Sequence, residues 1–588
     1  MVAVFLPERD WSSLMPVATY QAGDFANPAK DCDVIMKGGV TSGLVYPYAI
    51  LEMARVYRFR SIGGTSAGAI AAAFAAAAEY ARTTRNDPEG FLRMQAHCEQ
   101  LPALLSGLFQ PAPQFATLMA FLLRAQANTG TIAIAWAVIV LFWPILSAGL
   151  ALGAAIAVLA GGGAIAAILG GAIGAVIALI LYLRGTASAL ARHNFGLCTG
   201  LTQAGASQSG LTDWMHDAIQ DIAFGKAGRP QPLTFGDLEG LTADSQPIEL
   251  RMMTTNLSMR RPHTLPNLRM RAFFDLAAWR QYFPSSIIDH LARVSSVPRH
   301  HEHLRDFPAA PDLPVVVAAR MSLSFPLLFC AVPMWTRDIA SSVLARHTGG
   351  DGTVRLRRLW FIDGGVSSNF PIHMFDALLP SRPTFALSLD ALPPGARETG
   401  NRVKFATSAG DGVNLPVHAV DSLFGFAGSV LDAAKDWQDN VLSGMPGQRE
   451  RIARVMLSRS EGGLNLTMPP AKSAALMQYG REVGIGFATG APDFDEHRWR
   501  RTLVTYEQLE RTVHATAQTW SDKGFGAWLK TYMSISKSYG RVGKADRANI
   551  RARLNGFAGL ARLFTPPLVG KERKLPRPPG RLRIGPDL

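Results

Sequence analysis

Residues 61–70 of the chain read Ser61-Ile-Gly-Gly-Thr-Ser-Ala-Gly-Ala-Ile70, and the fold prediction starts from this stretch. Within it, Gly64-Thr-Ser-Ala-Gly68 matches Gly-x-Ser-x-Gly, the pattern of a nucleophile elbow, in which a serine lies on a strained turn between a strand and a helix. An apolar run, Phe59 to Ile62, precedes the glycines, and helix-forming residues, mostly alanine, follow from Ala67. This order predicts a strand, a turn and a helix, with Ser66 as the nucleophile; a plain glycine-rich turn is the alternative.

The two glycines of the motif have a steric reason. Side chains two residues before and after the serine would collide in so tight a turn, and glycine also accepts unusual backbone dihedrals at little cost. Gly64 and Gly68 are therefore expected to support the geometry of the turn.

The stretch before the elbow indicates an α/β fold. A strand is predicted over Cys32 to Met36 and a helix over Tyr46 to Tyr57, with a glycine-containing loop between them. In a parallel sheet this loop lies at the same edge as the elbow, so the backbone N–H groups of Gly38, Gly39 and Val40 are predicted to form an oxyanion hole. A phosphate-binding loop is the rival interpretation, but the loop lacks Gly-Lys-Ser/Thr and Gly-x-Gly-x-x-Gly.

A run of 59 residues, Ala125 to Leu183, contains no charged side chain. Gly161-Gly-Gly163 divides it into two stretches, Thr131 to Ala160 and Ala164 to Leu183, and each provides the roughly 20 residues that cross the hydrocarbon core of a bilayer. The run is therefore predicted to be a transmembrane hairpin of two helices, with a buried hairpin in a large soluble core as the alternative.

Small residues recur within the hairpin at a spacing of four, as Gly149 with Gly153 and Gly170 with Gly174, which favours close helix packing. Basic residues flank the hairpin on both sides: Arg124 before it, Arg184 and Arg192 after it. The positive-inside rule then predicts that both flanks, and the catalytic domain with them, face the cytoplasm.

After the hairpin the α/β pattern resumes. Strands are predicted over Ile248 to Thr254, Val315 to Ala319, Leu359 to Ile362, Thr384 to Leu389 and Ile452 to Leu457. Helices are predicted over Leu211 to Phe224, Val417 to Leu442, Lys472 to Val483 and Tyr506 to Trp520.

One of these strands leads into Phe361-Ile-Asp-Gly-Gly-Val-Ser-Ser-Asn-Phe-Pro371. Asp363 ends an apolar strand, which in a parallel sheet would place its carboxylate in the active-site crevice, and Gly364 and Gly365 follow it directly. We therefore predict Asp363 as the general base; an ordinary Asp-Gly turn is the alternative.

Taken together, these motifs resemble those of the patatin-like phospholipases. The resemblance rests on Lys37-Gly-Gly-Val-Thr-Ser-Gly43, Gly64-Thr-Ser-Ala-Gly68, Ala319-Arg-Met-Ser-Leu-Ser-Phe-Pro326, and Asp363-Gly-Gly365 with Asn369 and Pro371. It covers roughly residues 31 to 395, interrupted by the hairpin. It implies a three-layer α/β domain with a mainly parallel sheet, and a lipid acyl hydrolase with a serine-aspartate dyad, Ser66 and Asp363, that needs no cofactor and no metal.

The chain departs from the family pattern in its glycine-rich loop, where Val40 replaces a third glycine and Ser42 a basic residue. A histidine base in the order Ser, Asp, His is a second alternative, with His373 or His418 as candidates.

Composition bounds the remaining possibilities. The chain has 588 residues, 48% hydrophobic, and a net charge of +14, yet no zinc-finger or RNA-binding signature, so a membrane partner is favoured over nucleic acid. The N-terminus is not typical of a signal peptide. The four cysteines, far apart in the sequence, indicate a reducing compartment.

The predicted organisation has six parts: an irregular segment 1–30, the first part of the patatin-like domain 31–128, the hairpin 129–184, the second part of the domain 185–395, a mostly helical region 396–565 and a basic disordered tail 566–588. The predicted function is a hydrolase anchored in a bacterial-type inner membrane that cleaves esters of phospholipids or lysophospholipids. A hydrolase of neutral glycerides or small esters, or a membrane scaffold with the same fold, remains an alternative.

Overall fold

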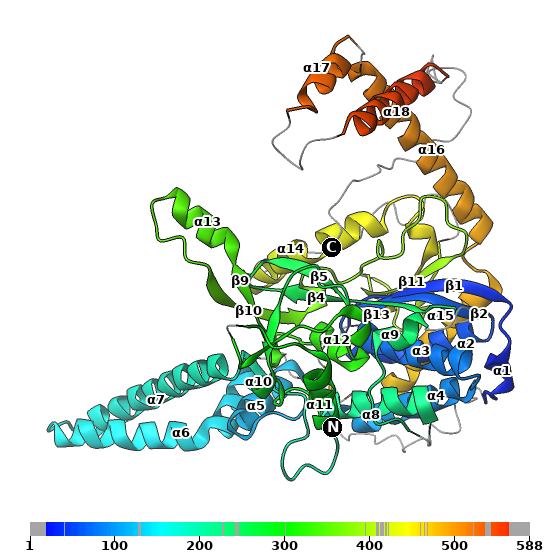
Figure 1. Cartoon of the computed structure of the whole chain (residues 1–588). Coiled ribbons are helices and arrows are strands. Elements are labelled where there is room, and N and C mark those ends of the chain that lie inside the picture. The colour runs from blue at the N-terminus through cyan, green and yellow to red at the C-terminus, as the bar shows by residue number, and fades with distance from the viewer. Residues whose placement is uncertain are drawn as a thin grey trace.

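The structure is a computed structural model of the whole chain (Figure 1). It describes residues 19–563 with short gaps at 40, 128–130, 226–227, 241–245, 300, 394, 407–410, 412–416, 418–419, 421–422, 459, 464, 467, 521–522 and 536–542. The predicted tail 566–588 and most of the predicted irregular segment 1–30 lie outside these residues. Within residues 19–30, helix α1 (Gly23–Ala26) is already formed.

In the described part of the chain, eleven strands form one sheet. They are β1 (Lys30–Met36), β2 (Tyr57–Gly64), β4 (Glu249–Asn256), β5 (Arg261–Leu265), β6 (Phe273–Asp275), β7 (Leu304–Asp306), β9 (Val332–Asp338), β10 (Arg355–Asp363), β11 (Thr384–Ala391), β12 (Val403–Lys404) and β13 (Ile452–Leu457). Their order is β12-β13-β11-β1-β2-β4-β10-β9-β6-β7, with β5 paired to β4. The strands from β13 to β4 are parallel, whereas every pairing outside them is antiparallel. The predicted parallel sheet therefore forms only the middle of a mixed sheet.

One face of the sheet is covered by helices, as the β-α-β-α pattern predicts. These are α2 (Tyr46–Ala54), α3 (Ala67–Thr84), α4 (Glu89–Leu108), α8 (Leu211–Phe224) and α15 (Pro470–Thr489). Helix α2 ends three residues before the predicted end at Tyr57, because Tyr57 already belongs to β2. Alternate β1 side chains, Cys32, Val34 and Met36, enter the large core on this face.

The opposite face carries a smaller apolar cluster, which includes Ile35 and Met253 from the sheet. A loop after β10 covers this cluster with Phe370 and Ile372, and α14 (Leu423–Ser443) adds Leu442. The layer predicted to be helical is thus built here from a loop and one long helix. The loop reaches the edge at which β1 ends, where its Asn369 carbonyl accepts the Gly38 N–H, and α14 contacts the loop there through Asp439.

The predicted strand Val315–Ala319 is wrong: these residues begin helix α12 (Val315–Ser322). Pro314 directly precedes the helix, a position at which proline favours helix starts, and Ala318 to Met321 are good helix formers. Packing of α12 between α3 and β4 therefore outweighs the preference of three consecutive valines, which are β-branched, for a strand.

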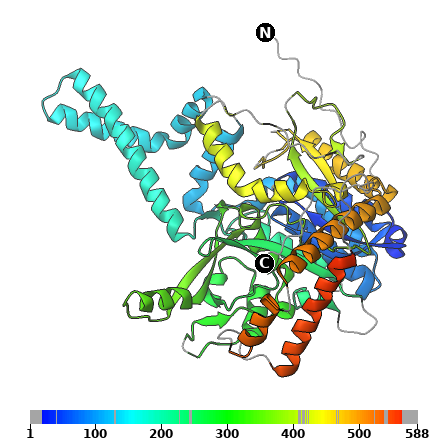
Figure 2. The same cartoon turned by 90° about the horizontal axis from the view of Figure 1, so that it is seen from above.

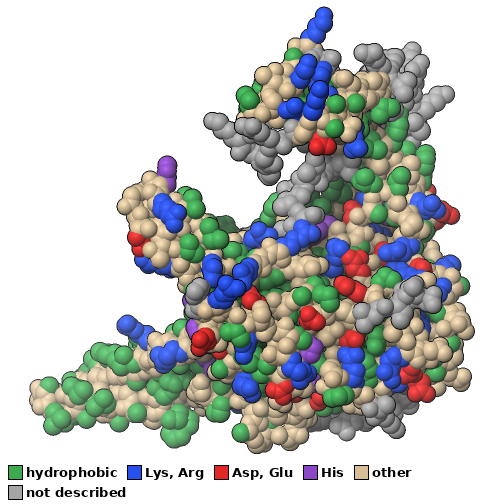
Figure 3. Space-filling model, in the orientation of Figure 1, with side chains coloured by type: hydrophobic (Ala, Val, Ile, Leu, Met, Phe, Trp, Pro, Cys, Tyr) green, Lys and Arg blue, Asp and Glu red, His purple; other side chains and the backbone are tan. Residues whose placement is uncertain are grey.

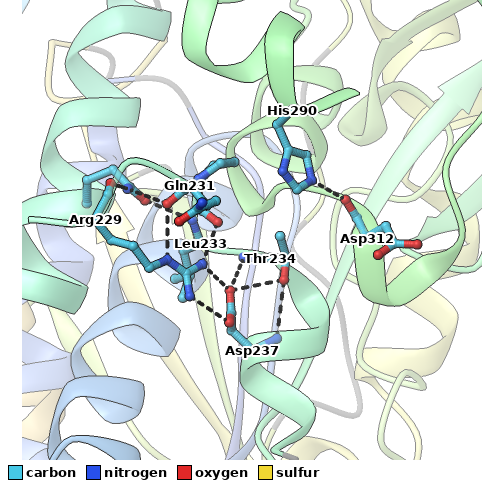
Figure 4. Close-up of polar contacts among 9 residues, drawn as sticks. Arg229, Gln231, Leu233, Thr234, Asp237, His290 and Asp312 are labelled. Carbon is cyan, nitrogen blue, oxygen red and sulfur yellow. Dashed lines mark hydrogen bonds and ion pairs between the residues drawn. The ribbon is translucent and has the colours of Figure 1, made fainter. Parts of the chain in front are cut away.

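The start of α12 is fixed by contacts of the residues just before it and of Val315. Backbone bonds join Phe235 N–H to the Leu313 carbonyl and Val315 N–H to the Leu233 carbonyl. Asp237 caps α9 (Phe235–Glu239) together with Thr234, and a ring nitrogen of His290 lies 2.9 Å from the Asp312 carbonyl (Figure 4). As a result, the N-terminal end of α12 is held in a defined place.

The composition change near residue 395 does not mark the end of the sheet. β13 pairs in parallel with β11, β12 pairs with β13, and α15 packs against α2. The predicted strand at Ile452–Leu457 is confirmed to the residue. Beyond α15, helices α16 (Phe494–Thr519), α17 (Phe525–Tyr532) and α18 (Lys544–Leu563) extend away from the sheet (Figure 1).

The apolar run forms two long antiparallel helices, α6 (Thr131–Leu159) and α7 (Ala164–Arg192), which project from the body (Figures 1 and 2). Among the described residues these two helices are long and apolar enough to cross a bilayer, and only 11% and 6% of their most apolar windows are buried. A hairpin inside the core of this chain would be mostly buried, whereas these two helices are mostly exposed. On the face drawn in Figure 3, the outer part of the projection carries hydrophobic side chains among tan backbone and other atoms, with no charged side chain.

Glycine packing joins the two helices of the hairpin. A Cβ atom added to Gly153 would lie 2.1 Å from the Gly170 carbonyl oxygen, and one added to Gly174 would lie 2.2 Å from the Gly149 carbonyl oxygen. The predicted small-residue positions thus lie where the two backbones approach most closely.

The remaining helices are α5 (Ala116–Ala127), α10 (Leu276–Trp279), α11 (Ser285–Val294) and α13 (Ile339–His347). A second, two-stranded sheet joins β3 (Gly196–Cys198) to β8 (Leu327–Phe329).

Candidate active site

Ser66 lies two residues after the end of β2 and directly before the first residue of α3, as the elbow pattern predicts. Its backbone dihedrals, φ 57° and ψ −126°, fall in a region that non-glycine residues rarely adopt. The side chain is only 3% exposed. The turn therefore stores strain at the residue predicted to be the nucleophile.

The glycines on either side of Ser66 are required by backbone contacts. A Cβ atom on Gly64 would lie 2.1 Å from the Gly68 carbonyl oxygen, and one on Gly68 would lie 2.5 Å from the Met36 carbonyl oxygen. Both neighbours are backbone atoms that cannot rotate away, so the turn can form only with glycine at these two positions.

The loop after β1 lies directly against Ser66. The Ser66 hydroxyl donates to the Gly39 carbonyl at 3.0 Å, and a Cβ atom on Gly38 would lie 3.4 Å from the Ser66 Cβ. The Gly39 carbonyl also accepts the Ala67 N–H at 3.2 Å. In this conformation the Gly39 carbonyl oxygen already accepts the Ala67 N–H, a donor that an oxyanion beside Ser66 would need.

The three residues predicted to form the oxyanion hole have different environments. The Gly38 N–H donates to the Asn369 carbonyl at 2.8 Å and is therefore already used. Gly39 has the carbonyl contacts given above, and Val40 lies outside the described residues. Glycine at position 39 leaves the backbone free to turn that carbonyl away.

Asp363 ends β10, but this strand is antiparallel to β4, with Asp363 opposite Thr254. The prediction that Asp363 follows a parallel strand is thus wrong in direction. β9, α13 and β10 follow one another and form an arm, of which β10 is the returning strand. β10 therefore runs from this arm into the sheet and ends near the sheet edge at Asp363. A strand of either direction can deliver a side chain to the edge if it ends at the right register.

The Asp363 carboxylate is 3% exposed, and its Oδ1 accepts the Gly365 N–H at 2.6 Å. A Cβ atom on Gly364 would lie 2.2 Å from the Met253 carbonyl oxygen, and one on Gly365 would lie 2.8 Å from Asp363 Oδ1. The two glycines after the aspartate allow the chain to turn closely around its carboxylate.

Ser66 and Asp363 share neighbours at the C-terminal end of α12. Ser322 Oγ accepts the Ser66 N–H at 3.1 Å, and the Ser324 carbonyl accepts the Asp363 N–H at 2.9 Å. Asn369 supplies a second link, because its Oδ1 would contact Cβ atoms placed on both Gly38 and Gly365. The structure therefore brings together the elbow, the glycine loop and the aspartate turn.

The segment after α12 is held by Arg320, which is fully buried. Its guanidinium donates to Ser324 Oγ at 2.6 Å, to the Thr199 carbonyl at 2.8 Å and to the Cys330 carbonyl at 3.3 Å. Burial lowers the pKa of Arg320 to about 10. The Arg320 guanidinium thus fixes the backbone beneath the site.

Sequence reasoning did not identify Ser322, Ser324 or Asp439 as part of the site. The first two lie in the segment quoted for the family resemblance, which could have indicated them. Asp439 lies in α14, and its Oδ2 accepts the N–H groups of Asn369 at 2.8 Å and Phe370 at 2.7 Å. No sequence motif points to this aspartate.

The histidine alternative gains no support. His373 is half-buried, its charge interactions are with Asp376 and Arg451, and desolvation lowers its pKa. His418 lies outside the described residues. Among the described residues, no group of three or more His, Cys, Asp or Glu side chains could hold a metal ion.

An apolar pocket lies beside the elbow. Ala67, directly after Ser66, and Leu323, directly after Ser322, belong to its lining. The other lining residues come mainly from α2, α3, α4 and α8: Thr41, Gly43, Leu44, Pro47, Ile50, Ile70, Ala71, Phe74, Met94, Cys98, Leu101, Leu105, Leu108, Phe109, Leu211 and Trp214. Its apolar lining suits a hydrocarbon group better than a polar ligand.

Comparisons with known proteins give one extensive sequence match. The RpoH suppressor of Rhizobium meliloti (strain 1021) is 34% identical over 635 aligned residues, which cover 95% of this chain and 99% of that protein. No family model matches the chain. Among solved structures, VipD from Legionella pneumophila is 11% identical (TM-score 0.30, 91% of this chain and 85% of that chain). ExoU from Pseudomonas aeruginosa, in complex with SpcU, is 14% identical (TM-score 0.25, 91% and 69%). Both TM-scores are low, so we base nothing on these two likenesses.

Proposed function

The chain belongs to the family of the RpoH suppressor of Rhizobium meliloti, and since that name states no chemistry, we propose a function from the site itself: a membrane-anchored serine hydrolase that cleaves acyl esters of phospholipids or lysophospholipids. The observation that carries the proposal is the strained Ser66 with a pocket beside it whose lining is almost entirely apolar. A nucleophile next to an apolar pocket suits the ester of a fatty acid.

In the proposed mechanism, Ser66 Oγ attacks the ester carbonyl while the Asp363 carboxylate takes the hydroxyl proton. The tetrahedral intermediate collapses, the ester C–O bond breaks, and Asp363 returns the proton to the leaving alcohol. Water then attacks the acyl-enzyme with Asp363 again as base, which releases the fatty acid and restores Ser66. Ser66 and Asp363 are each only 3% exposed, so little water surrounds the proposed pair.

The oxyanion needs donors that the Gly39 carbonyl now occupies. We expect substrate to displace this carbonyl, so that the Ala67 N–H at the start of α3 faces the oxyanion instead. The positive end of the helix macrodipole adds to this stabilisation. Gly39 is the residue in the loop best able to accommodate such a turn.

The test of the catalytic proposal uses a fluorophosphonate probe and a defined phospholipid mixture. Wild type should be labelled and release fatty acid, Ser66→Ala should do neither, and Asp363→Asn should lose fatty-acid release while it stays folded. Ser285→Ala and Asp289→Asn, both exposed on α11, are the matched controls and should behave as wild type. Full labelling of Ser66→Ala would refute the assignment, and the released products would identify the ester position.

The membrane part of the proposal rests on α6 and α7. Leu159 is 87% exposed and Ile165 76%, so the hairpin presents hydrocarbon to its surroundings, and transfer of that surface into a bilayer is strongly favourable. Anchoring would also hold the site beside its substrate at high effective concentration.

A cysteine placed at the hairpin turn, Gly161→Cys, tests the orientation in intact bacterial cells, since all four native cysteines are buried. It should react with a membrane-impermeant maleimide, whereas Ser285→Cys on the body should react only after lysis. The reverse pattern, or release of the full chain by alkaline carbonate, would contradict the anchored arrangement.

A further inference from the structure

Helix α14 approaches the candidate site from outside the sheet, on the face covered by the loop after β10. Asp439 on this helix is 6% exposed, and its single oxygen Oδ2 accepts two consecutive backbone N–H groups, from Asn369 and Phe370. A carboxylate that accepts two adjacent N–H groups fixes the direction of the peptide between them. Asp439 thus controls the turn at Asn369.

The turn at Asn369 contacts both the glycine loop and the Asp363 turn. Its carbonyl accepts the Gly38 N–H at 2.8 Å, and its side-chain Oδ1 lies close to Gly38 and Gly365. Gly38 lies against Ser66, and Gly365 donates to the Asp363 carboxylate. A displacement of Asn369 would therefore move the glycine loop relative to the nucleophile and the base.

We propose, resting on the hydrolase function above, that Asp439 is a positioning residue for this site: its ionised carboxylate holds the Asn369–Phe370 turn, which keeps the glycine loop and the Asp363 turn in register with Ser66. The C-terminal region is then a working part of the enzyme, because it supplies the residue that aligns a site made by the rest of the chain.

The charge environment makes this contact sensitive to pH. Lys37 from the end of β1 and Asp436 one turn earlier on α14 act on Asp439, and the Lys37 ammonium is itself paired with Asp390 on β11 at 2.9 Å. Burial raises the pKa of Asp439 to about 6, Asp436 adds to the rise, and the two backbone N–H groups and Lys37 oppose it. Below about pH 6 the carboxyl is protonated and its bonds to the turn weaken.

Helix α14 also has an outer face on the side opposite Asp439. Phe426, Val430, Trp437 and Val441 recur at helical spacing and are 59%, 50%, 54% and 57% exposed. Asp439 lies about half a helical turn away from them at 100° per residue. The contact with the turn is therefore made by the inner face alone, and a change there can be tested without altering the outer face.

The experiment measures the rate at which a fluorophosphonate labels the full-length protein in detergent, between pH 5 and 8.5. In wild type the rate should fall below about pH 6, as Asp439 is protonated. Asp439→Asn keeps an oxygen that can accept both N–H groups but has no charge, so its rate should be roughly tenfold lower at pH 8 and should lack this step. Asp439→Ala should be slower still, by about 100-fold.

Asp436→Asn is the matched control, on the same helix one turn away. Loss of its charge should move the step to lower pH, because Asp436 raises the pKa of Asp439, and should leave the rate at pH 8 unchanged. A purely structural role would not give this shift.

The outcomes separate the two proposals. If wild type is not labelled at all, or if Ser66→Ala is labelled equally, the hydrolase assignment fails and this inference with it. If Ser66 is labelled in wild type but Asp439→Asn keeps the wild-type rate and the step near pH 6, the hydrolase stands and the positioning role is refuted.

Discussion

The replacement of Asp439 by asparagine should make the protein more stable while it makes the site slower. A carboxyl group whose pKa is higher in the folded than in the unfolded protein binds its proton more tightly in the folded state, so its ionisation weakens the fold. The pKa of Asp439 rises from 3.8 to about 6, which is about 2 pH units at 1.36 kcal/mol each. The ionised carboxylate therefore costs up to about 3 kcal/mol of unfolding free energy at neutral pH.

The sign and the pH window follow from these two pKa values. Below pH 3.8 the group is protonated in both states and costs nothing; the cost grows between pH 3.8 and about 6 and is complete above that. Asparagine is neutral throughout, so the difference between the two proteins isolates this one group.

The assay is thermal unfolding of wild type and Asp439→Asn in the same detergent from pH 4 to 8. The melting temperatures should coincide at pH 4 and differ by a few degrees at pH 8, with the variant higher. A lower melting temperature for the variant at pH 8, or a difference that does not change with pH, would refute the reasoning.

Three other changes test separate parts of the structure. Gly153→Leu should force α6 and α7 apart and make the hairpin sensitive to protease in detergent, whereas Gly163→Ala, which has no neighbour within 4 Å of the added Cβ, should not. Arg320→Lys cannot make all three bonds of the guanidinium and should lower the unfolding free energy, measured in denaturant, by about 2–4 kcal/mol. Ala71→Phe should fill part of the cavity and raise KM for long-chain esters by about tenfold while short esters are hydrolysed as before, measured on an ester series.

The local chemistry of the sequence predicted the elbow well, because its constraint is steric and acts over five residues. Gly64 and Gly68 are needed for contacts with backbone atoms, and the strand and helix beside them have strong intrinsic preferences. The hairpin was equally predictable, since nothing but length and the absence of charge defines it.

Contacts between distant segments were not predictable in the same way. Val315–Val317 read as a strand but form a helix, because packing between α3 and β4 decides their conformation. The direction of β10 depends on its pairing with β9 and β4, which leaves no local signal. Nothing in the sequence distinguishes Asp439 from the other aspartates of α14, and only the folded chain brings it to Asn369.

The position of the hairpin along the chain also sets the timing of assembly. Ser66 is synthesised first, α6 and α7 next, and Asp363 and Asp439 only afterwards. Because a chain emerges from the ribosome from its N-terminus, the hairpin is available for insertion before the base and its positioning residue exist. Under the proposed function, a nascent chain would reach its membrane before it could cleave any lipid, and a chain truncated before Asp363 would be anchored but inert.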